Sequence, residues 1–352
     1  MNTSFSEYVA GKKAEVVLPW NNVYDLISYE TYQRLNLILQ CVVKPILSVV
    51  GIPSNIVNCV VFWRQGLRDR MNFCLFCLAL ADLLYLLSLL CVTQIGPLIE
   101  LVDEMLGKEI YFKSNRYGLA IRDQTRTMAS CINLVISIER CVCVYLPLRA
   151  SSLMKKGTMV KLLASIFVIT QVGFVYNFFH YEVVSRQSNV TNKTIYWVAE
   201  ASKTFKDYYF LFQGVEVFLL TFLPLCIFIT IFITTLATVV KLKAALSWRE
   251  KASSSGSDKQ TQQRGLIKML VIVSCVYIIT STPYVGHILI TVFLPGFDMG
   301  SRYQNSFLTL AMIATICTEV HCAFNFVIYY RNSSRYRSEL KAFFSCTASK
   351  VT

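Results

Sequence analysis

The chain has 352 residues, of which 55% are hydrophobic and only 16% are charged, and its formal net charge is +13. A soluble domain has about 25% charged residues, so this composition excludes an ordinary soluble protein, although the length alone would suggest two soluble domains. The basic excess does not indicate nucleic-acid binding, because the sequence has no zinc-finger spacing and no RNA-binding signature. With a mean hydropathy of +0.50, the chain is predicted to be one polytopic domain in a lipid bilayer, without a nucleic-acid partner.

Seven apolar segments follow one another along the chain, and each is close to or above the roughly 20 residues that cross a bilayer as a helix. Only helices and closed barrels span lipid, and long segments with few strand or turn signals indicate helices. The predicted fold class is therefore an all-α membrane protein, a seven-transmembrane helix bundle. The segments are residues 35–63, 71–97, 115–146, 159–179, 208–240, 266–294 and 305–330.

The orientation of the bundle follows from the charges of its loops. Lysine and arginine gather after segments one, three, five and seven, whereas acidic residues gather on the other side. Because basic loops stay in the cytoplasm, residues 1–34 are predicted to be an extracellular N-terminus, 35–330 the membrane domain and 331–352 a cytoplasmic tail. The N-terminus has no signal-peptide pattern, so the first segment is expected to target the chain. Glycosylation sequons begin on the predicted outer side at Asn2, Asn189 and Asn192.

The tail and the third cytoplasmic loop contain two further patterns. Residues 332–344 place Tyr336, Leu340, Phe343 and Phe344 at helical spacing, which predicts a short amphipathic helix on the inner membrane surface. Asn332 or Ser333 would cap its N-terminus, and Cys346 just beyond it either carries a lipid or is a plain cysteine. Residues 253–263, SSSGSDKQTQQ, indicate a flexible linker, with phosphorylation as the alternative.

The sequence gives no sign of metal, cofactor or catalytic chemistry. Most of the 13 cysteines lie inside apolar segments, where cysteine behaves as a small hydrophobic residue, and the loops show no disulfide framework. Only three histidines are present, and no HExxH pattern occurs, so neither a metal site nor a membrane enzyme is expected. The inverted repeats and interrupted helix pairs that are typical of a transporter are also not visible.

Several short motifs fall on successive segments in a specific order. They are GIPSNIV at 51–57, LALAD at 78–82, Glu139-Arg140-Cys141 followed by Pro147-Leu148, the prolines Pro224 and Pro283, and NFVIY at 325–329. Together these motifs resemble those of the rhodopsin-like (class A) G-protein-coupled receptors, and the resemblance covers nearly the whole chain. The stretches FWRQGLRDRMN and ERCVCVYLPL are also similar to sequences of invertebrate orphan receptors of the peptide or chemosensory type.

The chain departs from that family at several positions. Asn115 stands where the family has a cysteine at the outer end of segment three, and residues 180–207 contain no cysteine partner. The family disulfide is therefore expected to be absent and the outer loop less constrained. Thr280-Ser281-Thr282 precedes Pro283 without the family's tryptophan, while Phe326 and Phe232 replace a proline and a tyrosine. These losses put the family's activation relay, but not its fold, in doubt.

The resemblance implies a G-protein switch at the cytoplasmic end of segment three. In the family, the acid that corresponds to Glu139 restrains Arg140 at rest, Arg140 contacts the G protein in the active state, and Tyr329 belongs to the same relay. Arginine suits this role because it stays charged and offers a rigid fork of donors. Gln263 stands where many such receptors have a second restraining acid. The alternative is a snorkelling pair that only anchors the end of the helix.

The resemblance also implies a polar network in the middle of the membrane. Asp82 is costly in an apolar helix unless it is solvated, paired or neutralised, and in the family it joins the residues that correspond to Asn55 and Asn325, often with a sodium ion. Here Ala129 and Cys322 replace the usual hydroxyl ligands. A network among Asn55, Asp82 and Asn325 is expected, and a sodium ion there stays an open possibility.

Ionisable residues near the outer end of segment three nominate a ligand pocket. Arg122 lies eighteen residues before Arg140, about five helical turns, where amine receptors of the family have an aspartate, so a monoamine ligand is excluded. Arg126 follows one turn later, and we expect Glu319 to pair with Arg122 or Arg126, with Asp123 and Glu216 as further partners. A buried ion network without a ligand is the alternative. The predicted pocket residues are Arg122, Asp123, Arg126, Tyr284, His287 and Glu319.

These observations predict a plasma-membrane receptor that couples an extracellular ligand, a peptide or an acidic small molecule, to a heterotrimeric G protein. The chain itself would need no cofactor and catalyse no reaction. Two alternatives stay open: a receptor-like seven-helix protein with little or no G-protein signalling, and a transporter.

Overall fold

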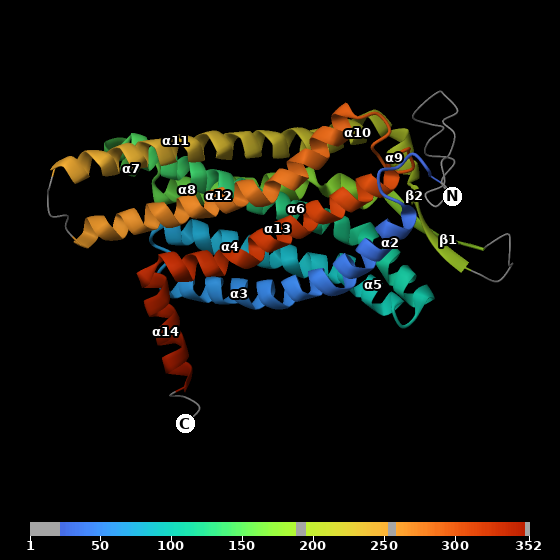
Figure 1. Ribbon diagram of the computed structural model, residues 1–352, viewed down its shortest axis with the longest axis horizontal. Coiled ribbons are helices and arrows are strands. Elements are labelled where there is room, and N and C mark those ends of the chain that lie inside the picture. The colour runs from blue at the N-terminus through green and yellow to red at the C-terminus, as the bar shows by residue number, and fades with distance from the viewer. Residues whose placement is uncertain (1–21, 188–194, 253–257, 349–352) are drawn as a thin grey trace.

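The computed structural model describes residues 22–187, 195–252 and 258–348. In this part of the chain, seven helical stretches are long and apolar enough to cross a membrane, and they pack side by side as one elongated bundle (Figure 1). The prediction of a seven-transmembrane bundle is confirmed. The stretches are Tyr29–Arg64, Arg70–Glu100, Glu104–Tyr145, Lys156–Phe179, Tyr209–Ala244, Met269–Phe293 and Gln304–Asn332.

Several of the spanning stretches consist of two α-helices joined by a single turn of π-helix, and one ends in a short 3-10 helix; these short helices are labelled η. The first comprises α2 (Tyr29–Ile38), η2 (Leu39–Val43) and α3 (Lys44–Arg64), and the second comprises α4 (Arg70–Leu89), η3 (Leu90–Gln94) and α5 (Ile95–Glu100). The other elements are α6 (Glu104–Tyr145), α7 (Pro147–Leu153), α8 (Lys156–Gly173), η4 (Val175–Phe179), β1 (Tyr181–Gln187), β2 (Ile195–Ala201), α9 (Lys203–Asp207), α10 (Tyr209–Val217), η5 (Phe218–Phe222), α11 (Leu223–Ala252), α12 (Asp258–Phe293), α13 (Gln304–Asn332) and α14 (Ser334–Ala348).

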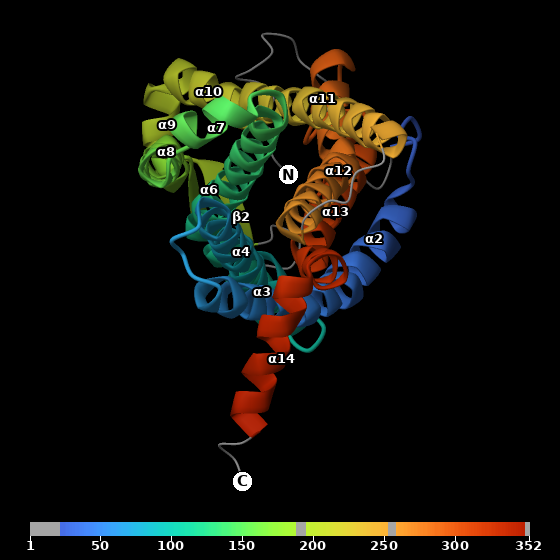
Figure 2. The same cartoon turned by 90° about the vertical axis from the view of Figure 1, so that its left-hand side faces the viewer.

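Helix α6 is the central element of the bundle. Seen from one end of the bundle, it runs between α4 and α11, and it also contacts α8 and α12 (Figure 2). Its buried face carries both Asp123 and Glu139, which are 16 residues apart along the helix. Because a helix rises 1.5 Å per residue, the two sites that the sequence nominates are held about 24 Å apart on one rod.

We call the side of the bundle that the loop charges predict to be extracellular the outer side, and the opposite side the cytoplasmic side. The outer end of α6 extends beyond the predicted boundary, because the helix begins at Glu104 and not near residue 115. Asp103 caps it by accepting hydrogen bonds from the backbone N–H groups of Met105 and Leu106, both at 3.0 Å. Lysines four residues after Glu104 and Glu109 pair with these acids on the solvent-facing side. Glu104 and Glu109, which precede the predicted start of segment three, are therefore helical, and Asn115 lies inside the helix.

A β-hairpin covers the outer end of the bundle between α8 and α9. Strands β1 and β2 pair antiparallel from Tyr181 opposite Ala201 to Gln187 opposite Ile195. At the base of the hairpin, the ring of His180 stacks between Tyr181 (4.0 Å between centroids) and Phe205 (4.1 Å). This burial lowers the pKa of His180 to about 4. The described residues of the outer loop, which was expected to be less constrained than one with the family disulfide, are thus restrained by strand pairing and aromatic stacking.

Helix α14 follows α13 after a sharp change of direction and points away from the bundle (Figure 1). Ser333 caps it, because its Oγ accepts a hydrogen bond from the Tyr336 N–H at 3.1 Å. Tyr336 and Leu340 are buried against the bundle, and the Tyr336 hydroxyl donates to Asn58 Oδ1 at 2.6 Å, whereas Phe344 is exposed. The predicted amphipathic helix and its serine cap are confirmed.

The third cytoplasmic loop is shorter than the sequence suggested. Helix α11 continues to Ala252 and α12 begins at Asp258, so residues 258–263 of the predicted linker are helical. Most residues in the DKQTQQ stretch favour or tolerate a helix, and they continue the register of α12.

Candidate functional site

An ionic cluster joins three helices at the cytoplasmic end of the bundle. The Glu139 side chain is completely buried, and its Oε2 atom pairs with the Arg140 guanidinium, which is 8% exposed. Its Oε1 atom lies 3.1 Å from Nε of Arg70, at the start of α4. The Cys143 thiol donates to the same oxygen at 3.3 Å. One carboxylate therefore compensates two guanidinium groups where little water reaches them.

Arg70 extends this cluster to the second cytoplasmic loop. Its Nη1 atom donates to the backbone carbonyls of Met154 at 2.8 Å and Ala150 at 3.2 Å. The loop helix α7 is therefore tied to Glu139 through one side chain. In the sequence, Arg70 is one of the basic residues between segments one and two, and its role in this cluster was not predicted. The signal that was missed is the position of this arginine directly after Asp69, which caps α4 through the Met71 N–H at 3.0 Å.

Tyr329, the third predicted switch residue, lies in the buried core between α3, α13 and α14. Its ring contacts Phe62 edge-on at 5.1 Å and Tyr336 at 5.9 Å. In the described part of the chain its hydroxyl has no hydrogen-bond partner. Among the described residues, Tyr329 therefore forms no hydrogen bond with Glu139 or Arg140.

The predicted polar network in the middle of the bundle is assembled around Asp82, which is completely buried. Asn325 Nδ2 donates to Asp82 Oδ2 at 2.8 Å, and the Cys322 thiol donates to Oδ1 at 3.3 Å. Asn55 joins indirectly, because its Nδ2 donates to the Cys322 carbonyl at 3.0 Å. Both oxygens of Asp82 already accept hydrogen bonds, and Ala129 and Cys322 offer no oxygen ligand, so these residues fit a sodium ion poorly.

A second ionic cluster lies toward the outer end of α6. Asp123 Oδ1 accepts from Arg122 Nε at 3.0 Å and from Arg122 Nη2 at 2.9 Å. The same oxygen lies 3.6 Å from Arg126 Nη2. The Arg126 guanidinium also lies over the ring of Tyr284, 4.5 Å from its centroid. Arg126 is thus paired loosely with a carboxylate that is already engaged by its neighbour.

The expectation that Glu319 pairs with Arg122 or Arg126 is wrong. Asp123 takes both arginines because it lies beside Arg122 and one turn before Arg126 on the same helix. Glu319 is completely buried, and within the described residues neither of its oxygens has a hydrogen-bond partner. Among the described residues Glu319 forms no ion pair, and the charge of Lys44, buried in α3, acts on it from beyond ion-pair distance.

Of the remaining pocket residues, Tyr284 lies beside Arg126, whereas His287 belongs to an aromatic cluster. His287 packs in an aromatic cluster with Phe307 at 4.7 Å and Phe297 at 6.1 Å, near the outer ends of α12 and α13. Tyr284 donates its hydroxyl to the Leu220 carbonyl at 3.3 Å. The predicted glycosylation positions Asn2, Asn189 and Asn192 lie outside the described residues.

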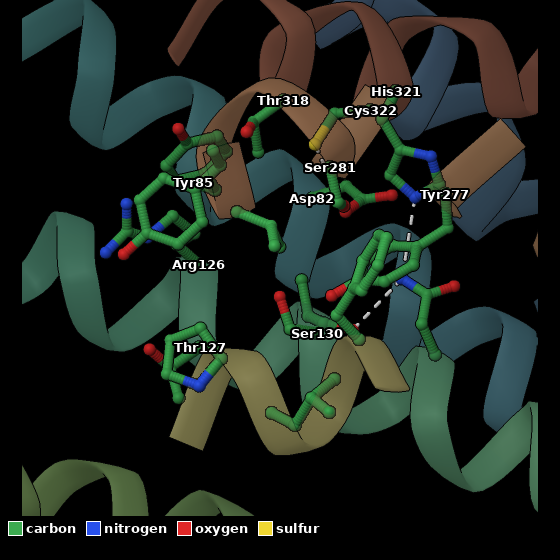
Figure 3. Close-up of a pocket in the computed structure, with 17 residues that line it drawn as sticks. Asp82, Tyr85, Arg126, Thr127, Ser130, Tyr277, Ser281, Thr318, His321 and Cys322 are labelled. Carbon is green, nitrogen blue, oxygen red and sulfur yellow. Dashed lines mark hydrogen bonds between the residues drawn. The ribbon is translucent and has the colours of Figure 1, made fainter. Parts of the chain in front are cut away.

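A buried cavity connects the arginine cluster with the Asp82 network. Figure 3 shows Arg126 and Tyr85 on one side of this inner cavity and Asp82, Cys322 and His321 on the other, with hydroxyl side chains between them. The volume open to the centres of water molecules is about 40 Å³, enough for two or three waters among polar partners. The lining hydroxyls come from Thr127, Ser130, Tyr277, Ser281 and Thr318.

Comparison with known families decides the class of protein. Residues 42–347 match the family described as serpentine type 7TM GPCR chemoreceptor Srw. The chain belongs to this family. The matched range contains all seven spans except the first turns of span one, together with both ionic clusters. The predicted resemblance to G-protein-coupled receptors is thereby confirmed: the Srw chain is a multi-pass membrane receptor and not an enzyme.

Individual relatives agree with this assignment. The Srw chain is 25% identical over 315 residues to the putative G-protein coupled receptor F59B2.13 of Caenorhabditis elegans, covering 84% of the chain and 71% of that receptor. It is also 30% identical over 132 residues to neuromedin-U receptor 1 of Mus musculus. The rat neuromedin-U receptor 1 is 33% identical over 133 residues. Each of these two matches spans only 29% of the neuromedin-U receptor.

Proposed function

We propose that the Srw chain is a plasma-membrane receptor with its N-terminus outside the cell, which couples an extracellular ligand carrying a carboxylate to a heterotrimeric G protein. The ligand would be an acidic small molecule or a peptide with an acidic end. Its carboxylate would bind Arg126 at the outer end of the inner cavity. Arg140 would contact the G protein at the opposite end of α6.

The observation that carries the ligand class is the incomplete pairing of Arg126. Its nearest carboxylate oxygen lies 3.6 Å away, and this oxygen also receives two hydrogen bonds from Arg122. Arg122, Asp123 and Arg126 together carry a net charge of +1. A ligand carboxylate would complete a charge-assisted pair with Arg126, whereas an ammonium group would meet two guanidinium groups. The charges therefore favour an acidic ligand over an amine.

The small size of the inner cavity supports binding through one terminal group. Water centres reach only about 40 Å³ of it, so a carboxylate and a few atoms would fill it, and the bulk of a peptide would stay among the outer ends of the helices. Displacing ordered water from Asp82, Ser130 and Ser281 would change the hydrogen bonding between the outer and central clusters. In this way the inner cavity provides a physical route from ligand to the bundle interior.

The contacts of the cytoplasmic ionic cluster are those expected of a receptor in its resting conformation. Glu139 holds Arg140, and Arg70 holds Glu139 together with the loop helix α7. A ligand that binds the active conformation more tightly would shift the population towards it. Arg140 would then leave Glu139 and become available to the G protein.

The test of the ligand class compares two identical substitutions on α6. Arg126→Gln removes the proposed partner of the ligand carboxylate, whereas Arg116→Gln removes an arginine that stacks on Tyr117 ten residues nearer the outer end. Cells expressing each receptor would be screened with carboxylates and peptides, with surface expression measured in parallel. We expect Arg126→Gln to raise the effective concentration of an acidic agonist at least tenfold, and Arg116→Gln to change it less than threefold. Equal potency in both variants would contradict the proposed site.

A receptor that binds its ligand without G-protein signalling is the second candidate function. It is favoured by the loss of the family tryptophan, in whose place Ser281 lines the inner cavity. It is also favoured by Tyr329, whose hydroxyl has no hydrogen-bond partner among the described residues. Nucleotide exchange measured across all classes of heterotrimeric G protein separates the two functions. Ligand binding without exchange in any class would establish the second.

A further inference from the structure

An open apolar groove lies on the outer half of the bundle between α12 and α13, away from the inner cavity. Helix α12 lines it with Leu289, Ile290 and Phe293, and α13 contributes Leu310 and Ser306. Its volume open to the centres of water molecules is about 610 Å³, compared with about 40 Å³ for the inner cavity. We refer to it as the outer groove.

The N-terminal segment before α2 forms one wall of the outer groove through Leu26 and Ile27. Asp25 ties this segment to the first turn of α13: its Oδ2 atom accepts from the Asn305 N–H at 2.7 Å, and its Oδ1 atom accepts from the Ser306 hydroxyl at 2.5 Å. Asn305 Nδ2 donates in return to the Ile27 carbonyl at 3.2 Å. The start of α2 accordingly lies beside the outer end of α13 in both views (Figures 1 and 2). The groove is therefore shaped by specific polar contacts at its edge.

The position of the outer groove on membrane-spanning helices means that lipid, and not water, lies against it. Both α12 up to Phe293 and α13 from Gln304 belong to membrane-spanning stretches, and Leu289 and Phe293 are 41% and 79% exposed. Apolar side chains exposed at this depth face lipid hydrocarbon and not water. The groove's polar side chain, Ser306, already donates to Asp25. The lining therefore offers a hydrocarbon chain many contacts and no unsatisfied polar group.

A cation lies at the interfacial edge of the same groove. Arg302 is held over the ring of Tyr24 at 4.8 Å, and its backbone carbonyl accepts from Asn22 Nδ2 at 2.5 Å. Tyr303 N–H donates to the Gly296 carbonyl at 2.9 Å, which brings Arg302 beside Gly296, the residue before Phe297 of the groove. Among residues 22–187, 195–252 and 258–348, no carboxylate lies within ion-pair distance of the Arg302 guanidinium. This edge therefore suits a phosphate group.

We infer that the outer groove binds a phospholipid of the outer leaflet, with the first part of one acyl chain against Leu289 and Leu310 and the phosphate beside Arg302. The groove extends over about five residues of α12, roughly 8 Å, so it receives the chain segment nearest the headgroup. The chain enters laterally from the bilayer, because the exposed Phe293 lines the open side. The clamp by Asp25 keeps the N-terminal segment over the bound lipid. This site is independent of the proposed ligand and of G-protein coupling.

The test measures phospholipid retained by the purified full-length receptor. Receptor from nanodiscs of phosphatidylcholine and phosphatidylglycerol would be washed in detergent, and bound lipid would be identified by native mass spectrometry. Leu289→Trp fills the outer groove, whereas Leu236→Trp places the same side chain at an exposed apolar position of α11, 55% exposed. We expect about one retained phospholipid in the wild type and in Leu236→Trp, and at least a fivefold loss in Leu289→Trp.

A second pair of variants tests the phosphate contact. Arg302→Gln should reduce phospholipid retention about fivefold, as expected for the loss of one arginine at a membrane surface, and Arg34→Gln, at an exposed outer arginine 76% accessible, should leave it unchanged. Equal retention in wild type, Leu289→Trp and Arg302→Gln would overturn the inference. Wild-type receptor that retains no phospholipid, or retains a phosphorus-free hydrophobic compound in its place, would also overturn it.

Discussion

Replacing Glu139 with glutamine removes the negative charge that lies between two arginines at the cytoplasmic end of the bundle. Glu139 is completely buried, Arg140 is 8% exposed, and Arg70 lies 3.1 Å from the same carboxylate. Glutamine keeps the shape and one acceptor but loses the charge. Hydrogen bonds to charged groups are worth about 1.5–3 kcal/mol, so the resting conformation should lose about that much relative to one in which Arg140 is free. Because about 1.4 kcal/mol is a factor of ten, the active population should rise about tenfold to hundredfold.

The assay measures ligand-free nucleotide exchange by purified heterotrimeric G proteins in the presence of receptor in nanodiscs. Glu339→Gln is the matched control, since its carboxylate is about one-third exposed and lies 3.9 Å from Arg64, a surface pair of little value. We expect at least a tenfold rise in the exchange rate with Glu139→Gln and less than a twofold change with Glu339→Gln. The same basal rate in both variants, at equal receptor concentration, would refute the restraint of Arg140 by Glu139.

Three further predictions concern stability. Arg70→Ala should lower the free energy of unfolding by about 2 kcal/mol, because Arg70 bonds two loop carbonyls as well as Glu139; a thermal midpoint equal to that of the wild type would contradict this. Gly118→Ala should lower the free energy of unfolding by about 1–3 kcal/mol, because the new Cβ would overlap the Val92 side chain. Gly214→Ala places its Cβ in open space and should raise the thermal midpoint slightly. Equal effects of the two substitutions would exclude the close approach of Gly118 to Val92. The free energy of unfolding should decrease as the pH is lowered from about 6.5 to about 4, because the unfolded chain binds a proton at His180 that burial disfavours in the folded state. His180→Phe should weaken this pH dependence of the thermal midpoint. An unchanged slope would rule out His180 as its source.

The seven spans could be predicted because bilayer thickness sets the length of an apolar helix that crosses it. The cap of α14 could also be predicted, since Ser333 bonds an N–H three residues away and the interaction is entirely local. The extension of α6 to Glu104 was missed because hydropathy finds only the part of a helix that contacts lipid. Asp103 and the two lysine–glutamate pairs stabilise the extra turns in a polar environment, and their spacing was the available signal.

The sequence predicted which residues make up the candidate site better than it predicted which of them pair with one another. Asp123 rather than Glu319 holds Arg122 and Arg126, and the choice depends on side-chain rotamers and on the distance between α6 and α13. Lys44 and Glu319, 275 positions apart along the chain, are both buried, and the charge of Lys44 acts on Glu319 from beyond ion-pair distance. Arg70 likewise reaches Glu139 across 69 positions. Such contacts depend on the rotation of neighbouring helices about their axes, which the apolar pattern of each helix constrains only loosely.

The most direct test of the central claim is nucleotide exchange by each class of heterotrimeric G protein with wild-type receptor, Arg140→Ala receptor and empty nanodiscs, in the presence of an acidic agonist from the screen. Arg140 is the side chain that Glu139 holds at rest and that the proposed function releases. We predict that at least one class exchanges nucleotide faster with the wild type than with empty nanodiscs, and that Arg140→Ala removes this difference while agonist binding persists. Exchange equal to that of empty nanodiscs in every class, or acceleration that survives Arg140→Ala, would contradict the proposed coupling.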